Sequence, residues 1–82
     1  MTRYFFHVRD GDRLLLDDEG EELPDLVAAR SYAIESARQL LSQAVLNGTA
    51  GSVRQLIQVL DEGGQTVLAI PVGLATVTES QT

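Results

Sequence analysis

The stretch LVAARSYAIESARQLLSQAVL, residues 26–46, decides the fold of this 82-residue chain. Its apolar residues recur every three or four positions, so one stripe of a helix is apolar and the opposite side is polar. Four alanines in the stripe would let the helix axis approach a sheet closely. The apolar arc contains Leu26, Ala29, Ala33, Ala37, Leu40, Leu41 and Ala44, with Val27, Ile34 and Val45 at its edge. The stretch predicts one helix that covers a single face of a sheet.

Both ends of this helix carry termination signals. Asp25 is a good N-cap, because its carboxylate can accept hydrogen bonds from the free amides of the first turn and its charge suits the positive end of the helix dipole. Asn47-Gly48 follows the last apolar position, and Gly48 can adopt the left-handed conformation that ends many helices. We therefore expect the helix to begin and end within this segment.

A hairpin signature precedes the helix. Residues 3–9 alternate in side-chain character and are rich in aromatic and β-branched residues, which predicts a strand. Asp10-Gly11 predicts a two-residue turn of type I′, and residues 14–16 return as a second strand. The charged segment 17–22 around Gly20 is expected to be a solvated loop.

A second hairpin signature follows the helix. Residues 53–60 predict a third strand, residues 62–65 a turn with two glycines, and residues 66–72 a fourth strand. Pro71 cannot donate a hydrogen bond to a ladder, so it should lie at the end of its strand or on an edge.

These elements combine into a ββαββ order and an α+β fold of two layers. Two hairpins must share one sheet, because each alone would expose half of its apolar surface. We expect a four-stranded antiparallel sheet with spatial order 2-1-3-4, the alternative being that the fourth strand lies beside the first. Residues 1–73 should form a single domain, and residues 74–82 a C-terminal tail that is loosely ordered or docked on a neighbour.

Composition narrows the classes of partner. The formal net charge is −6, and eight of the twelve acidic residues fall between positions 10 and 25. Such a surface repels a phosphate backbone, so nucleic-acid binding is disfavoured. No apolar run approaches the roughly 20 residues that a membrane span needs. The chain has no cysteine, which suits a reducing compartment, and the cytoplasm is the expected location.

Several strings of residues together resemble a known family. They are Arg3-Tyr4-Phe5-Phe6-His7-Val8-Arg9-Asp10-Gly11, Asp17-Asp18-Glu19-Gly20, Glu22-Leu23-Pro24-Asp25-Leu26 and Ala28-Ala29-Arg30, with Asp61-Glu62, Gly64 and Val67-Leu68 further on. The chain is similar over about residues 3–70 to short uncharacterised bacterial proteins that carry only a domain-of-unknown-function label. The resemblance implies a small cytosolic domain and no established activity, so it transfers no catalytic residue.

The second face of the sheet supplies the main functional hypothesis. If alternate strand residues face the helix, then four bulky residues point the other way, where a single helix cannot cover them. They are Phe5, Leu56, Leu60 and Val67. An exposed patch of this kind marks association surfaces. We therefore expect a non-enzymatic binding or self-associating module, as a homodimer through this face or an edge strand, or with another protein.

Two other classes of function compete with this one. Asp10, Asp12, Asp17, Asp18 and Glu19 could bind a hard cation such as Ca²⁺, although their spacing does not match an EF-hand, and a solvated charged turn is the favoured interpretation. His7 has carboxylates nearby and could be a general base. The sequence places no nucleophile, glycine-rich phosphate loop or metal-ligand cluster beside it. We assign no catalytic residue, metal or cofactor, and a small enzyme that uses His7 ranks third.

Arg30 is the one charged residue inside the apolar arc of the helix. Its stem could cover the edge of the core while its head stays in water. The favoured alternative is an ion pair with Glu21 or Glu22 (or Asp17) that clamps the acidic loop to the helix.

Overall fold

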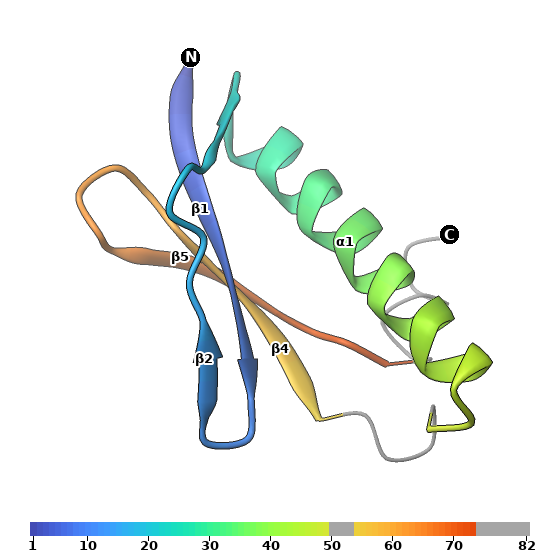
Figure 1. The fold of residues 1–82 in the computed structure, drawn as a ribbon. Helices are drawn as coiled ribbons and strands as arrows, with labels where there is room; N and C mark the ends of the chain where they lie inside the picture. The colour runs from blue at the N-terminus through green and yellow to red at the C-terminus, as the bar shows by residue number, and fades with distance from the viewer. Residues whose placement is uncertain (50–53, 74–82) are drawn as a thin grey trace.

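The computed structural model of the protein describes residues 1–49 and 54–73, which form a sheet and a helix packed in two layers (Figure 1). The elements are β1 (Thr2–Asp10), β2 (Arg13–Leu15), β3 (Glu21–Leu23), α1 (Leu26–Leu46), β4 (Gln55–Leu60) and β5 (Thr66–Pro71). The predicted tail, residues 74–82, lies outside the described residues. Within the described part of the chain, no helix is long and apolar enough to cross a membrane.

All strand pairs are antiparallel, and the main sheet has the order β2-β1-β4-β5. This confirms the predicted 2-1-3-4 order and the α+β fold. The long strand β1 lies at the centre, because it pairs with β4 along one edge and with two short strands along the other.

Strand β3 was not predicted. Residues 17–22 were expected to form a solvated loop, but Glu21–Leu23 pairs with the beginning of β1, in the register Thr2↔Leu23 and Tyr4↔Glu21. Two adjacent acidic residues carry no apolar alternation, so the sequence pattern gave no strand signal. Charged residues are nevertheless common on sheet edges, where their side chains stay in water.

The first hairpin turn is shifted by one residue from the prediction. Asp10 pairs with Arg13, so the two loop residues are Gly11 and Asp12 rather than Asp10 and Gly11. Gly11 has φ +60°, and no residue other than glycine has a positive φ in the described ranges. A single positive φ at the first loop position corresponds to a type II′ turn rather than to the expected type I′.

The helix boundaries agree with the prediction. The Asp25 carboxylate accepts a hydrogen bond from the Ala28 amide at 2.9 Å, and Asn47 is the C-cap, followed by Gly48 with φ +73°. The buried stripe is made of Ala29, Ala33, Ile34, Ala37, Leu41 and Ala44. It packs on sheet residues that share one face, namely Tyr4, Ile57, Val59, Ile70 and Val72.

Gly20 is the point at which the chain turns back onto β1. It has φ +71°, and a Cβ built there would lie 2.8 Å from the Tyr4 carbonyl oxygen and 2.9 Å from Arg3 Cγ. The position therefore requires glycine both for its backbone conformation and for its close approach to a neighbouring strand.

We predict that Gly20→Ala destabilises the protein more than Gly48→Ala. Gly48 has nearly the same φ, but nothing lies within 4 Å of its Cβ position. Gly48→Ala should therefore cost roughly 1–2 kcal/mol from backbone conformation alone. Gly20→Ala should cost at least about 1 kcal/mol more, because β1 must move away from the new methyl group. Urea unfolding monitored by circular dichroism measures both variants, and equal losses would contradict the prediction.

Candidate functional site: the open β2 edge

One carboxylate joins the two short strands that pair with β1. Successive residues of a strand direct their amide groups to opposite edges. Along one edge of β1, the backbone groups of Tyr4 point to β3 and those of Val8 point to β2. Between them, the Phe6 amide donates a hydrogen bond to Asp17 Oδ2 at 3.1 Å. Asp17 thus takes the place of a strand partner at the gap between β2 and β3.

The same carboxylate also fixes the loop that follows it. Asp17 Oδ1 accepts hydrogen bonds from the amides of Glu19 at 3.3 Å and Gly20 at 3.0 Å. Desolvation raises the pKa of Asp17, but the hydrogen bonds from the amides of Phe6, Gly20 and Glu19 lower it by more, so the net pKa lies below its ordinary value of 3.8. Asp17 is therefore an ionised structural residue that organises the acidic loop.

His7 is held by the backbone of the same loop. Its Nδ1 accepts a hydrogen bond from the Asp17 amide at 3.0 Å. Because Nδ1 is the acceptor, the neutral ring carries its proton on Nε2. Neither nitrogen is then placed to act as a general base. Within residues 1–49 and 54–73, no group of three or more His, Asp or Glu residues could hold a metal ion.

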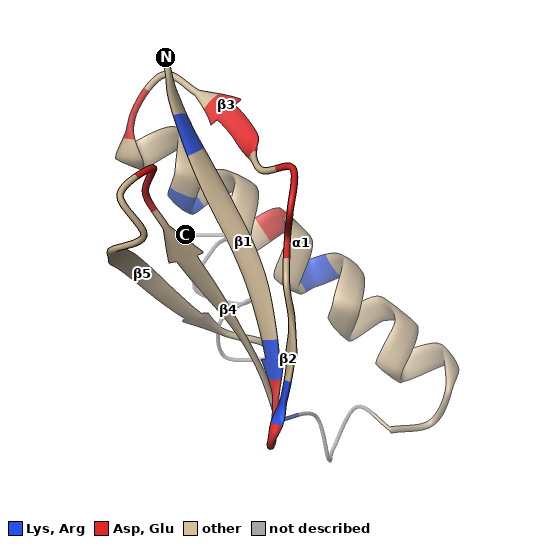
Figure 2. Cartoon of the chain, turned by 60° about the vertical axis from the view of Figure 1, so that its left-hand side comes forward, with Lys and Arg blue, Asp and Glu red and all other residues tan. Residues whose placement is uncertain are grey.

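Glu22 has an ion-pair partner that differs from the expected one. The Arg3 guanidinium lies 3.1 Å from the Glu22 carboxylate and donates a hydrogen bond to the Glu19 carbonyl oxygen at 2.6 Å. Arg3 and Glu22 are directly opposite each other in the β1–β3 register, and Figure 2 shows the basic and acidic bands side by side. Arg30 is exposed, and no ion pair joins it to Glu21 or Glu22 in the described ranges.

The second hairpin is tied to the same end of β1. The Glu62 carboxylate accepts a hydrogen bond from the Arg3 amide at 2.8 Å. Asp61 Oδ1 accepts from the amides of Gly63 at 2.9 Å and Gln65 at 3.0 Å, which closes the β4–β5 turn. Arg3 therefore connects β1 to β3 through its side chain and to this turn through its backbone.

The outer face of the sheet forms a smaller patch than expected. Phe5 and Leu60 are direct cross-strand neighbours and Leu56 lies opposite Arg9, all half-buried. His7 and Gln58 form the pair between these positions, so polar groups interrupt the patch. Val67 does not belong to it. The register between β4 and β5 shifts at Val59/Leu60, and Val67 packs against the core instead.

The most exposed large apolar side chains of the strands lie on β2 and just after it. Leu14, Leu15 and Leu16 are 41%, 52% and 64% exposed. Leu15 pairs with Val8 and so faces the helix side of the sheet, whereas Leu14 pairs with Arg9 on the outer side. In Figure 1, β2 lies at the edge of the sheet, away from α1. We call these three residues the leucine edge.

A groove separates α1 from the neighbouring part of β1. Its volume is about 340 Å³, and its apolar wall is made of Phe6, Val8, Tyr32, Leu40 and Ile57. The rings of Phe6 and Tyr32 lie 4.6 Å apart at an interplanar angle of 43°. The groove runs beside Val8, the strand partner of Leu15, so it continues the apolar surface of the leucine edge on the helix side.

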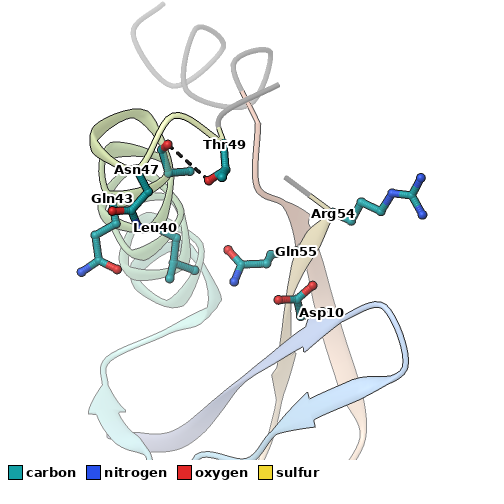
Figure 3. A pocket seen from close by; sticks show the side chains of 8 residues that line it. Asp10, Leu40, Gln43, Asn47, Thr49, Arg54 and Gln55 are labelled. Atoms are coloured by element: carbon teal, nitrogen blue, oxygen red, sulfur yellow. Dashed lines mark hydrogen bonds between the residues drawn. The ribbon is translucent and has the colours of Figure 1, made fainter. Parts of the chain in front are cut away.

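A second hollow of about 230 Å³ extends the groove toward the end of the helix and shares Leu40 and Gln43 with it. In Figure 3, the side chains of Asp10 and Gln55 lie on the sheet side of this hollow, and Arg54 points away from it. The groove therefore has an apolar part beside β2 and a polar end. A segment of polypeptide with one apolar side would match this surface.

Comparison with known proteins identifies a family but no activity. The model of a domain of unknown function, DUF6894, matches residues 3–73. No curated protein and no solved structure matches the chain.

We predict that Asp17→Asn lowers stability at neutral pH by roughly 1–3 kcal/mol, because charge-assisted hydrogen bonds to three amides are weakened. Since the pKa of Asp17 is lower in the folded protein, the unfolded chain binds more protons than the folded protein as the pH falls below 3.8. The contribution of Asp17 is therefore complete above this range and is lost as the pH falls through the native pKa. Urea unfolding between pH 6 and pH 2 should show a shallower profile for Asp17→Asn than for the parent. Asp18→Asn, at an exposed neighbour, should keep the parent stability at neutral pH, and parallel profiles for the parent and Asp17→Asn would contradict the role of Asp17.

We also predict that Arg3→Ala loosens β3, whereas Arg30→Ala does not. Arg3 holds both Glu22 and the Glu19 carbonyl, so its removal should speed hydrogen exchange of the β3 amides severalfold. Hydrogen exchange measured by NMR reports each amide separately. Faster exchange in Arg30→Ala, with little change in Arg3→Ala, would restore the clamp first predicted for Arg30.

Proposed function

Because the chain belongs to the DUF6894 family, whose description assigns no activity, we propose from the geometry that it is a non-enzymatic module that binds a polypeptide strand at its β2 edge. The cytoplasmic location predicted from the cysteine-free sequence is part of this proposal. The observation that carries it is the difference between the two edges of the sheet.

The β5 edge has two features that oppose strand addition. Pro71 has no amide hydrogen to donate, and the register shift at Val59/Leu60 interrupts the regular spacing of the ladder. The β2 edge has neither feature along the leucine edge, and its side chains are apolar. Natural sheets rarely leave such an edge uncovered, because it is a template for pairing with another chain.

Backbone groups on β2 are available for that pairing. Asp10 and Arg13 flank a two-residue loop, so they form the hydrogen-bonded pair that closes the hairpin. Alternation then directs the amide and carbonyl of Leu14 away from β1. The same alternation holds on β1, where the Phe6 amide points toward the β2 side and bonds to Asp17. An added strand would find a donor and an acceptor at Leu14.

The energies of these contacts indicate a modest affinity for an added strand. Burying the exposed half of a leucine side chain contributes roughly 1 kcal/mol, and a net hydrogen bond contributes about as much. Three leucines and two or three hydrogen bonds supply about 5–6 kcal/mol, which the entropy lost on association largely offsets. A partner must therefore also contact the groove that Phe6, Val8 and Tyr32 line, or contribute apolar side chains of its own.

Site-specific photo-crosslinking tests this proposal. A benzoylphenylalanine placed at Leu16, on the leucine edge, should yield covalent polypeptide adducts in cells that express the protein natively. The same probe at Ser31, an exposed position on α1, should yield none.

Adducts at Leu16 should also disappear when Leu14→Pro is added. The proline removes an outward-facing amide and one exposed leucine side chain but no hydrogen bond to β1, so a thermal melt should show that the fold persists. Equal labelling at both probe positions, or adducts that survive Leu14→Pro, would overturn the proposal.

A further inference from the structure

We propose that the strand received at the β2 edge is the β2 edge of a second copy of this chain. The two copies would pair antiparallel about a two-fold axis at Leu15, so that two sheets join into one. This inference rests on the proposed function of the edge and adds the identity of the partner and the register of the pairing.

The direction of the backbone groups restricts the register. Leu14 presents its amide and carbonyl outward, and alternation gives Leu16 the same orientation. The chain continues along β1 past Leu15, since the Asp17 amide and carboxylate both bond to β1 residues. In an antiparallel pair, outward-facing residues must meet each other. For a two-fold axis within the leucine edge, Leu14 therefore lies opposite the partner's Leu16, Leu14 or Asp18.

Side-chain chemistry selects among these three registers. With the axis at Leu15, Leu14 meets the partner's Leu16 and the two copies of Leu15 meet, so every leucine lies opposite a leucine. With the axis at Leu14, Leu15 would lie opposite the partner's Arg13 and Leu16 opposite the partner's Asp12. With the axis at Leu16, Leu15 would lie opposite the partner's Asp17 and Leu14 opposite the partner's Asp18. Each of these two alternatives places a charge against an apolar side chain at four positions, which wastes apolar burial and desolvates the charges.

The charges that flank the leucines are mixed in this register. The axis at Leu15 places Arg13 across from the partner's Asp17, but it also places Asp12 across from the partner's Asp18. The second pairing brings like charges together, which weakens the dimer at low salt. The register is therefore selected by the leucine contacts rather than by charge.

The same edge is unsuited to self-pairing elsewhere. Glu21 and Glu22 on β3 would bring like charges together if two copies paired there, and opposed like charges destabilise a strand pair. The β5 edge also has an apolar run, residues 67–70, but this run ends at Pro71 and begins beside the register shift, so the leucine edge is the more regular of the two. Because each copy carries a formal charge of −6, the dimer should tighten as salt screens the repulsion.

Sedimentation of the full chain from about 1 μM to about 1 mM tests the proposal, since the interface predicts a weak dimer. The wild-type protein should dimerise with rising concentration, more tightly at high salt. Leu15→Glu and Leu15→Lys should each weaken the dimer at least ~10-fold, because each places two like charges directly opposite. An equimolar mixture of the two variants should recover a dimer, because only a two-fold axis at residue 15 brings the unlike charges together.

The matched control is Leu56→Lys on the outer face, which should dimerise like the wild type. Circular dichroism of every variant confirms that a monomer is a folded monomer. A wild-type dimer that Leu56→Lys abolishes, or a mixture of the Leu15 variants that stays monomeric, would overturn the proposal. So would a wild-type chain that is monomeric throughout. In that case adducts to other polypeptides at Leu16 would preserve the proposed function, and their absence would remove it as well.

Discussion

The hydrogen bonds accepted by the Asp17 carboxylate connect the parts of this small sheet. Strand β1 is nine residues long, whereas the two strands on its outer edge have three residues each. The Asp17 side chain bonds to the Phe6 amide between them and orients the Glu19 and Gly20 amides, so that Gly20 can approach the Tyr4 carbonyl. Without this carboxylate the Phe6 amide would lack its partner, and the chain would have no fixed path from β2 to β3.

Several of the residues that carry the family resemblance belong to the hydrogen bonds around Asp17. Arg3 bonds to Glu22 and to the Glu19 carbonyl, and His7 accepts a hydrogen bond from the Asp17 amide. The strings around Arg3 and around Asp17 are separated in sequence but belong to one hydrogen-bonded network. These family residues therefore stabilise the outer edge of the sheet. The binding that we propose takes place at the neighbouring leucine edge.

The fold could be predicted because its signals are local or depend on simple burial. The caps of α1 and its alanine stripe need only neighbouring residues, and the strand order follows from the need to share one apolar face. The errors arose where one contact depends on a distant segment. Glu21 and Glu22 form a strand only because Asp17 and Gly20 direct them to β1, and the Arg3–Glu22 pair becomes evident once that strand is known.

Deviations from ideal alternation account for the other differences. Val67 was assigned to the outer face on the assumption of a regular strand, but the register shift beside Leu60 moves it toward the core. The leucine edge was visible in the sequence only as a returning strand. Its exposure depends on how much of the sheet α1 covers, and that extent is a property of the three-dimensional arrangement rather than of the residues themselves.

The unequal edges of the sheet have a consequence for the size of any assembly. A sheet that accepted strands equally at both ends could add copies without limit, which is the geometry of a fibril. Here Pro71 and the irregular ladder oppose growth at β5, and the two-fold contact proposed above would occupy the β2 edge of each copy. Assembly through this sheet would stop at two chains, so a cell could accumulate the protein without seeding polymerisation.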